Sequence, residues 1–280
     1  MFAQQTKTKI ILFIVVFLTL IVFILGVIAS KKNNIANNNT TPDTQATPDT
    51  SLLTKTTSAQ ETDTSFTTIV QTSTFQASQP SELTEMLSSN NISYEDLEKK
   101  GCRQLVTVIA DGGSADIRYF TCSNNQWIEL PQLISKGYVG RNGVSNCKKE
   151  SDGSTPMGLY RIGSAFYIDN APRTGLDTFK ITSNTYWIDD PDSKFYNQRV
   201  EGTNNKDWSS AEHMIQYDEY QYGFVINYNM PAIPNAGSAI FFHINDNTTS
   251  GCIATDEEAV LSYLENLDKA KNPYILITTD

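Results

Sequence analysis

The chain has 280 residues, a formal net charge of −10 and only 21 lysine and arginine residues. Nucleic-acid surfaces need clustered basic side chains, so this composition argues against nucleic-acid binding. The two histidines and four cysteines show neither His-x-x-His nor Cys-x-x-Cys spacing. We therefore predict no zinc or other metal site, and no cofactor.

An apolar run covers residues 10–28, and only Thr19 and Gly26 interrupt it. Its length matches the roughly 20 residues that cross a bilayer. A cleavable signal peptide usually has a shorter apolar core, although Val27-Ile28-Ala29 could serve as a cleavage site. We predict that residues 1–32 are a cytoplasmic tail and an uncleaved transmembrane anchor. The protein would then be a single-pass protein of the cell membrane, with the following chain outside the cell.

Residues 33–80 consist mainly of Asn, Thr, Ser, Gln, Asp and Pro, and Thr-Pro-Asp-Thr occurs twice, at Thr41–Thr44 and Thr47–Thr50. Such a composition cannot bury enough apolar surface to offset the entropy lost on ordering. We predict a disordered spacer that holds a domain away from the membrane. A spacer of this kind suits an enzyme that acts on a polymer layer outside the cell, and equally an adhesin or a receptor.

Residues 81–100 carry cap residues and helical spacing over Ser81–Leu87 and Ser93–Lys99, which predicts two short helices before the main domain. The domain itself is expected over residues 101–280, the length of one ordinary domain. Its first feature is a hairpin, because Gln104–Ala110 and Ile117–Cys122 read as strands joined at Asp111-Gly112-Gly113.

Further extended segments recur along the domain, with turn residues between them. They are Gly158–Ile162, Phe179–Ile181, Thr185–Ile188, Gly223–Tyr228, Ser238–Ile244 and Tyr274–Thr278. Only Ser209–Met214 and the segment after Cys252 are predicted to be helical. The fold class is therefore mainly β, a closed barrel or a sandwich with one helix packed near the site.

Cys102 and Cys122 flank the first hairpin and could form a disulfide, which a location outside the cell permits. Cys122 with Cys147 is the competing pair, because the sequence alone does not fix connectivity.

The segment from Ser238 to Thr255 brings a histidine and a cysteine to the two ends of one short loop. In the predicted strand, Ala239, Phe241 and His243 share one face, and Ile240, Phe242 and Ile244 share the other. Thr255 and Glu258 have the spacing of a capping box, which predicts a helix that begins just past Cys252. The positive end of such a helix would favour a thiolate at Cys252.

A buried thiol beside a satisfied core histidine is the ordinary explanation for such a pair, because free cysteine is among the most buried residue types. Two features favour chemistry instead. Gly251 permits the tight backbone approach of an oxyanion-binding turn, and the predicted helix favours the charged sulfur. We therefore interpret Cys252 as a nucleophile and His243 as its base.

These residues resemble the L,D-transpeptidases of the YkuD type, whose signature is a strand histidine, a loop and then Ser/Thr-His-Gly-Cys. The segments that carry the resemblance are His243, Thr249-Ser250-Gly251-Cys252, Val139–Gly143, Asp152–Tyr160 with its Thr155-Pro156-Met-Gly158, Trp187–Asn197 and Ser210–Met214. The resemblance covers Gln104 to the C-terminus. Ser250 and Ala254 depart from the pattern, which has His before Gly-Cys and Asn or Arg two residues after the cysteine.

The resemblance implies a cysteine enzyme that forms 3→3 cross-links between peptidoglycan stem peptides. Cys252 would attack the donor, His243 would transfer protons, Gly251 would contribute a backbone N–H to the oxyanion hole, and the carbonyl of Ile244 would orient His243. Donor and acceptor stems are then the partners, and a carbapenem is the expected covalent inhibitor.

Several other residues are candidates for contacts with the substrate. They are Arg141, which could instead fasten its own loop, and Trp187, Tyr196, Tyr228 and Ser250. Asp189, Asp190 and Asp192 could attract a cationic amine or form a solvated turn, and His213 is expected to have a structural role.

Three further functions stay open from the sequence. An L,D-carboxypeptidase would resolve the same intermediate with water. A sortase or another Cys-His peptidase of the cell wall would also use the thiol, although a sortase is expected to carry an arginine soon after its cysteine. A non-catalytic wall-binding module would keep the fold with an inert thiol.

Overall fold

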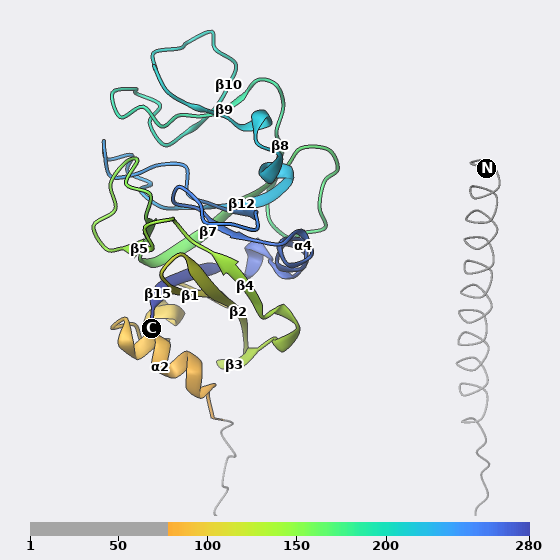
Figure 1. Cartoon of the computed structure of the whole chain (residues 1–280). Helices are drawn as coiled ribbons and strands as arrows, with labels where there is room; N and C mark the ends of the chain where they lie inside the picture. The colour runs from red at the N-terminus through yellow and green to blue at the C-terminus, as the bar shows by residue number, and fades with distance from the viewer. Residues whose placement is uncertain (1–77) are drawn as a thin grey trace, which may run out of the picture. The chain divides into compact units, whose positions relative to one another are not determined.

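The computed structural model describes residues 78–280, and Figure 1 shows the domain that they form. The predicted anchor at residues 10–28 and nearly all of the predicted spacer lie outside these residues. Within residues 78–280, no helix is both long and apolar enough to cross a bilayer.

The described chain is mainly β, as predicted. Its helices are α2 (Ser81–Ser89), α3 (Tyr94–Lys99) and α4 (Glu257–Asn266), with short 3-10 turns η1 (Pro131–Leu133), η2 (Met214–Gln216), η3 (Asp218–Gln221) and η4 (Lys269–Lys271). Its strands are β1 (Gln104–Asp111), β2 (Ser114–Ser123), β3 (Gln126–Glu129), β4 (Ser135–Tyr138), β5 (Val144–Ser145), β6 (Thr155–Pro156), β7 (Gly158–Tyr167), β8 (Thr178–Lys180), β9 (Thr185–Trp187), β10 (Arg199–Glu201), β11 (Glu212–His213), β12 (Tyr222–Ile226), β13 (Phe241–Ile244), β14 (Ile253–Thr255) and β15 (Tyr274–Thr279).

Most of these strands form one sheet that closes on itself. Its order is β1-β15-β7-β12-β13-β14-β4-β2-β3, and β1 also pairs with β2, so the path from β1 to β2 is a closed ring. Closure leaves few unpaired edges, which stabilises a sheet of short strands. The predicted hairpin of β1 and β2 is present, with Asp111 paired to Ser114.

The wall of this barrel has two apolar faces, because its strands alternate. In β15, Ile275 and Ile277 face the main core together with Phe242 of β13, whereas Leu276 faces outward. Helix α4 packs Val260, Tyr263 and Leu264 into the same core, and all three are fully buried. The barrel interior is therefore filled with side chains rather than hollow.

The two predicted helices before the domain are present and cover the outer face of β1, β2 and β15. Between the helices and these strands lies a second apolar cluster, separate from the main core. Leu83, Leu87 and Leu97 are almost completely buried in it. Ser93 begins α3 with a capping box, in which its hydroxyl accepts from the N–H of Asp96 and the Asp96 carboxylate accepts from the N–H of Ser93. Figure 1 shows α2 at the end of the domain opposite β9 and β10.

The predicted disulfide between Cys102 and Cys122 is not formed, and all four cysteines at residues 102–252 are free thiols. Cys102 Sγ donates to the carbonyl of Gln104 at 3.2 Å, and Arg103 Nη1 lies 4.0 Å from Cys122 Sγ. Both sulfurs lie in the second cluster, and each has its own polar contact. Cys147 is exposed on a loop.

The helix predicted over Ser209–Met214 is wrong. Glu212 and His213 instead form β11, which pairs with Trp187 and Tyr186 of β9. The pairing with a distant strand outweighs the local helical preference, which is only a weak guide over six residues. This small sheet of β10, β9 and β11 lies over a third apolar cluster. The cluster contains Phe166, Trp187, Met214, Tyr220, Val225, Ala239, Phe241 and Cys252.

The helix predicted to begin just past Cys252 begins later. Ile253–Thr255 form β14, which pairs in parallel with β13 and contacts β4. The N-cap of α4 is Asp256, whose carboxylate accepts from the N–H of Ala259 at 2.9 Å. Thr255 does not cap the helix, because its hydroxyl donates to the carbonyl of Lys136 at 2.7 Å.

Candidate active site

A cavity of about 450 Å³ lies beside the ends of β13 and β14. Its wall is formed by residues from segments 141–151, 189, 212–220, 238–243 and 245–252, which come together only in the fold. Cys252 and His243 both line it, so the two predicted catalytic side chains share one cavity.

The register of β13 and β14 puts these two side chains on one face. Phe242 pairs with Ile253 and His243 with Ala254, so Cys252 comes beside Phe241. Paired residues of parallel strands point to the same side, and the side alternates along each strand. The thiol and the imidazole are therefore diagonal neighbours on the cavity side, while Phe242 and Ile253 face the barrel core. This confirms the alternation that the sequence predicts.

Cys252 is held as a neutral thiol. Its side chain is only 7% exposed, its Sγ donates to the carbonyl of Ala239 at 3.2 Å, and it accepts from the N–H of Phe241 at 3.3 Å. Burial raises the pKa of the Cys252 thiol far above its ordinary value, and the nearby Glu212 carboxylate raises this pKa further. Since β14 separates Cys252 from α4, the predicted stabilisation of a thiolate by the helix end is wrong.

His243 is held as a neutral imidazole. Its Nδ1 lies 2.9 Å from the carbonyl of Ile244, and burial lowers its pKa below the ordinary value. With Nδ1 donating to that carbonyl, Nε2 is the nitrogen that can accept a proton. Tyr220 packs its ring edge against the imidazole, with ring centres 5.2 Å apart. Within residues 78–280, no hydrogen bond joins the sulfur to this ring, so the thiol must rotate before it can transfer its proton.

Alkylation of the free protein tests the neutral thiol. We expect iodoacetamide to modify the exposed Cys147 about tenfold or more faster than Cys252 near pH 7.5, because the thiolate is the reactive species. Raising the pH from 7 to 9 should increase the Cys252 rate about tenfold per pH unit. Peptide mass spectrometry measures both rates. A Cys252 rate that is already constant below pH 8 would show a preformed thiolate and contradict this description.

The turn before Cys252 is shaped by Gly251. Its φ of +155° is rare for residues with a side chain, and a Cβ there would lie 3.1 Å from the carbonyl of Ser154. The N–H of Gly251 donates to Thr249 Oγ1 at 3.1 Å, so this predicted oxyanion donor is occupied in the resting protein. Thr249 in turn donates to the carbonyl of Cys252 at 2.7 Å.

Thr155 joins two of the segments that carry the family resemblance, the Thr155-Pro156 segment and the turn before Cys252. Its hydroxyl lies 2.8 Å from the carbonyl of Gly251, and it accepts from the N–H of Gly140 at 2.8 Å. Thr155 is fully buried, so these hydrogen bonds are sheltered from water. The Thr-Pro segment thus fixes the turn that carries Cys252.

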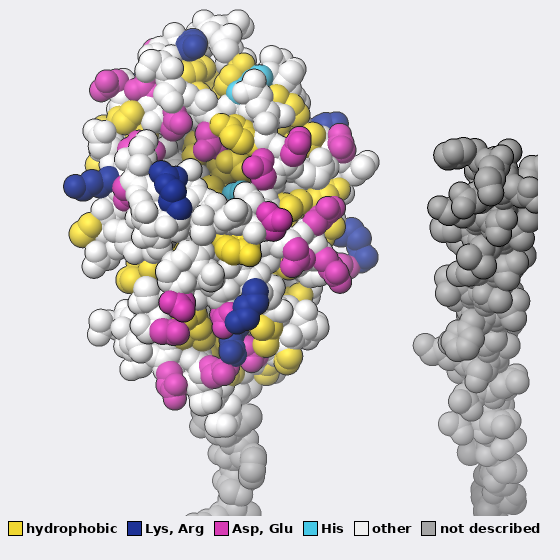
Figure 2. Space-filling model, viewed as in Figure 1, with side chains coloured by type: hydrophobic (Ala, Val, Ile, Leu, Met, Phe, Trp, Pro, Cys, Tyr) yellow, Lys and Arg dark blue, Asp and Glu magenta, His cyan; other side chains and the backbone are white. Residues whose placement is uncertain are grey.

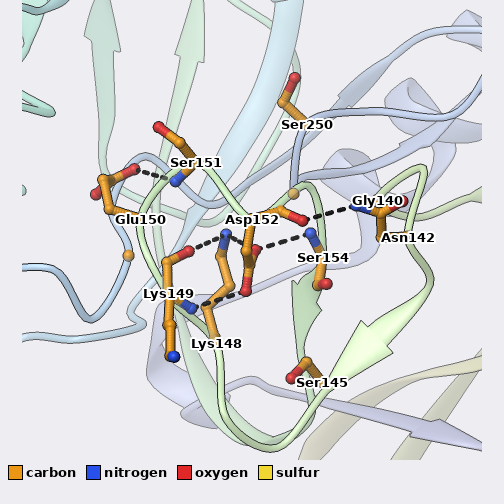
Figure 3. A network of polar contacts seen from close by, with 12 residues as sticks. Gly140, Asn142, Ser145, Lys148, Lys149, Glu150, Ser151, Asp152, Ser154 and Ser250 are labelled. Carbon is orange, nitrogen blue, oxygen red and sulfur yellow. Dashed lines mark hydrogen bonds and ion pairs between the residues drawn. The ribbon is translucent and has the colours of Figure 1, made fainter.

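Lys148 is a buried residue of the cavity wall that the sequence analysis did not single out. Its side chain is 4% exposed, and its Nζ lies 2.6 Å from Asp152 Oδ1 and 2.9 Å from the carbonyl of Lys149. The network in Figure 3 extends from Asp152 to the N–H of Ser154 and to that of Lys149. Burying the charge of a lysine costs free energy unless the charge is paired, and the ion pair with Asp152 provides that pairing.

Arg141 and Ser250, which were both predicted to contact the substrate, meet at the mouth of the cavity. Arg141 Nη1 donates to Ser250 Oγ at 3.1 Å, and the N–H of Arg141 donates to the carbonyl of Thr249 at 2.9 Å. Both side chains are exposed and line the cavity. Arg141 therefore fastens its loop to the cysteine turn and also presents a cation to the opening.

Three aromatic residues predicted to contact the substrate do not line the cavity. Trp187 packs edge-on against Phe241 with ring centres 4.9 Å apart, and its Nε1 donates to Asn197. Tyr196 is 2% exposed and donates its hydroxyl to Glu150. Tyr228 donates to the carbonyl of Ala236 at 2.5 Å. Trp187 and Tyr196 are buried, where large aromatic side chains stabilise most, and Tyr228 is half-buried.

Carboxylates dominate the charge of the cavity wall. Glu150, Asp189, Glu212 and Glu219 all line it, and sequence reasoning pointed only to Asp189. Burial raises the pKa of Glu212 to about 7 and also raises that of Asp189. Within residues 78–280, no group of three or more His, Cys, Asp or Glu residues could hold a metal ion.

The other predicted acidic residues have structural partners or are solvated. Asp190 accepts from the N–H and hydroxyl of Ser209 at 2.6 and 2.7 Å, and Asp192 is exposed. His213 stacks on Tyr186 with ring centres 4.4 Å apart. On the face drawn in Figure 2, basic side chains are interspersed among acidic ones and form no patch that would suit a nucleic acid.

Comparisons with known proteins identify the family of this domain. A family model described as the YkuD L,D-transpeptidase catalytic domain matches residues 103–275. None of the curated proteins matches the chain. A solved structure, the helical cell shape determining protein Pgp2 from Campylobacter jejuni, is 15% identical with a TM-score of 0.34. The similarity covers 62% of this chain and 47% of that one, so the chain spans about half of its length. Since the family model covers more than half of the chain, the protein belongs to the YkuD family, whose model is described as the L,D-transpeptidase catalytic domain.

Proposed function

We propose that this protein forms 3→3 cross-links in peptidoglycan. Cys252 Sγ attacks the carbonyl that joins the third residue of a stem tetrapeptide to its terminal D-Ala, and D-Ala leaves. A side-chain amine of a second stem then resolves the thioester. The observation that carries the proposal is the shared cavity of Cys252 and His243, with His243 Nδ1 held by the Ile244 carbonyl.

Protons move between two neutral groups in this mechanism. The thiol rotates away from Ala239 and gives its proton to His243 Nε2 as sulfur attacks, and the imidazolium then protonates the departing amine of D-Ala. The lowered pKa of His243 keeps its ring unprotonated and ready to accept at neutral pH. The nucleophile thus becomes charged only when a substrate is present.

The negative charge that develops on the carbonyl oxygen needs donors in the cysteine turn. The N–H groups of Cys252 and Gly251 are the proposed donors, and the Gly251 N–H must first leave Thr249 Oγ1. A single donor of this kind contributes roughly 3 kcal/mol to catalysis in acyl transfer. The Arg141 guanidinium and Ser250 Oγ at the mouth are suited to the carboxylate of the donor's terminal D-Ala.

A location outside the cell supports this function. The apolar run at residues 10–28 and the polar spacer at residues 33–80 suit a single-pass anchor that holds the catalytic domain at the cell wall. Peptidoglycan lies on that side of the membrane, so the substrate and the domain would meet there.

Product analysis tests the proposal. The full-length protein is incubated with a disaccharide tetrapeptide that has a diamino acid at its third position, and mass spectrometry follows the products. We expect dimers that have lost one D-Ala per cross-link, and a carbapenem should add its mass to the peptide that contains Cys252. A tripeptide monomer alone would identify a carboxypeptidase. Absence of both products and of the adduct would identify a wall-binding module, and either outcome would overturn the cross-linking proposal.

A further inference from the structure

We infer that Glu212 is a second base of the cross-linking reaction, which takes the first proton from the ammonium group of the acceptor stem, while the negative charge of Asp189 attracts that ammonium into the cavity. This inference rests on the proposed function and assigns the acceptor side of the cavity.

Proton balance creates the need for a second base. The acceptor side-chain amine arrives as R–NH3⁺, because an alkyl ammonium has a pKa of about 10.4 in water. Its nitrogen must lose two protons to become an amide. The C–N bond forms, the C–S bond breaks with its electron pair going to sulfur, and one proton returns to sulfur through His243. The other proton needs its own acceptor, since a single imidazole cannot hold two.

Glu212 has the position for this role. It extends from β11 and lines the same cavity as Cys252 and His243. Tyr220 donates its hydroxyl to Glu212 Oε2 at 2.7 Å, and the Tyr220 ring packs against His243. One carboxylate oxygen is thus fixed by Tyr220, which also fixes the imidazole, and Oε1 is left for the acceptor.

Asp189 adds negative charge beside Glu212. It lines the same cavity, yet its Oδ1 is enclosed and has no hydrogen-bond partner within residues 78–280. An unpaired buried carboxylate oxygen costs free energy unless a donor arrives. An ammonium group has three N–H donors, one of which can bond Glu212 Oε1, while the enclosed carboxylate of Asp189 acts through its charge.

The charges around Glu212 suit proton transfer near neutral pH. Burial raises its pKa to about 7, and the carboxylates of Asp189 and Glu150 add to this shift, while the Tyr220 hydrogen bond opposes it. A base is most effective when its pKa lies near the working pH. The Glu212 carboxylate also raises the pKa of the Cys252 thiol. A bound ammonium would offset this negative charge and so favour the departure of sulfur as a thiolate when the C–S bond breaks.

Glu212→Gln tests the inference, because it removes the base and keeps an acceptor oxygen for Tyr220. The full-length protein is first acylated by the donor tetrapeptide, and the thioester is then offered one of two amines. The first is a lysine side chain, which is an ammonium at neutral pH. The second is trifluoroethylamine, which is largely unprotonated there. Asp192→Asn is the matched control, because it removes one charge from an exposed side chain outside the cavity.

We expect Glu212→Gln to slow aminolysis by the lysine side chain about 100-fold. Aminolysis by trifluoroethylamine should change less than about threefold, because that amine carries no extra proton. Release of D-Ala in the first step should not decrease, and Asp192→Asn should match the unaltered protein throughout. An equal loss with both amines, or no loss with lysine, would overturn the role of Glu212 alone. No release of D-Ala by the unaltered protein would instead overturn the proposed function.

Discussion

Replacing Cys252 with alanine is expected to abolish the release of D-Ala from a stem tetrapeptide. Every step of the proposed reaction passes through a thioester at this sulfur, so the rate should fall at least about 10⁴-fold, to the limit of detection. The fold should persist, because the side chain loses only one atom and two hydrogen bonds, to Ala239 and Phe241. Chromatography coupled to mass spectrometry measures free D-Ala, and circular dichroism measures the melting temperature.

Cys147→Ala is the control for this experiment, since Cys147 is exposed and does not line the cavity. It should release D-Ala at the rate of the unaltered protein. If Cys252→Ala still released D-Ala at a measurable fraction of that rate, the nucleophile would have to lie elsewhere.

Replacing His243 with asparagine is expected to slow acylation about 10³-fold, in the range that general base catalysis supplies. The variant keeps a polar side chain next to the Ile244 carbonyl but has no group that accepts the thiol proton. In the unaltered protein, the acylation rate should fall at acid pH as Nε2 becomes protonated. Because burial lowers the pKa of His243, the midpoint of this fall should lie below the ordinary histidine value of about 6.5. The His243→Asn variant should lack this fall in acylation rate at acid pH.

The other histidine provides the comparison. His213 stacks on Tyr186, and its Nε2 lies 2.8 Å from the carbonyl of Ser183, outside the cavity. His213→Gln should therefore keep the acylation rate and the pH profile. Added imidazole should partly restore the His243→Asn variant, because a diffusible base can replace a missing one. An unchanged acid limb in His243→Asn would contradict the assignment of the base.

The centre of the site could be predicted because its signals are local. The alternation of Phe241 and His243 against Phe242 and Ile244 follows from the period of a strand, and β13 has it. The predicted strand began at Ser238, but Ala239 has a φ of +52° and β13 begins only at Phe241. The contact of His243 Nδ1 with the Ile244 carbonyl was expected only through the resemblance to the family. The hydrogen bond between Arg141 and Ser250 joins residues 109 positions apart and was not predicted.

The acidic wall could not be predicted, because it is assembled from distant segments. Glu212 reaches the cavity only because β11 pairs with β9, a contact between short strands that carry no strong pattern. The same limit explains β14, whose three residues have strand geometry through pairing with β13 and β4. Tyr196 was expected at the surface of a groove, yet its hydroxyl bonds Glu150 inside the wall.

The resting contact between Cys252 Sγ and the Ala239 carbonyl has a consequence for the durability of the protein. Peroxides attack the thiolate form of cysteine and convert it stepwise to sulfenic and irreversible sulfinic acids. A sulfur that is protonated, enclosed and turned toward a carbonyl offers such oxidants little to react with. A protein proposed to work outside the cell, away from the reducing systems of the cytoplasm, thus keeps its reactive atom chemically quiet between turnovers.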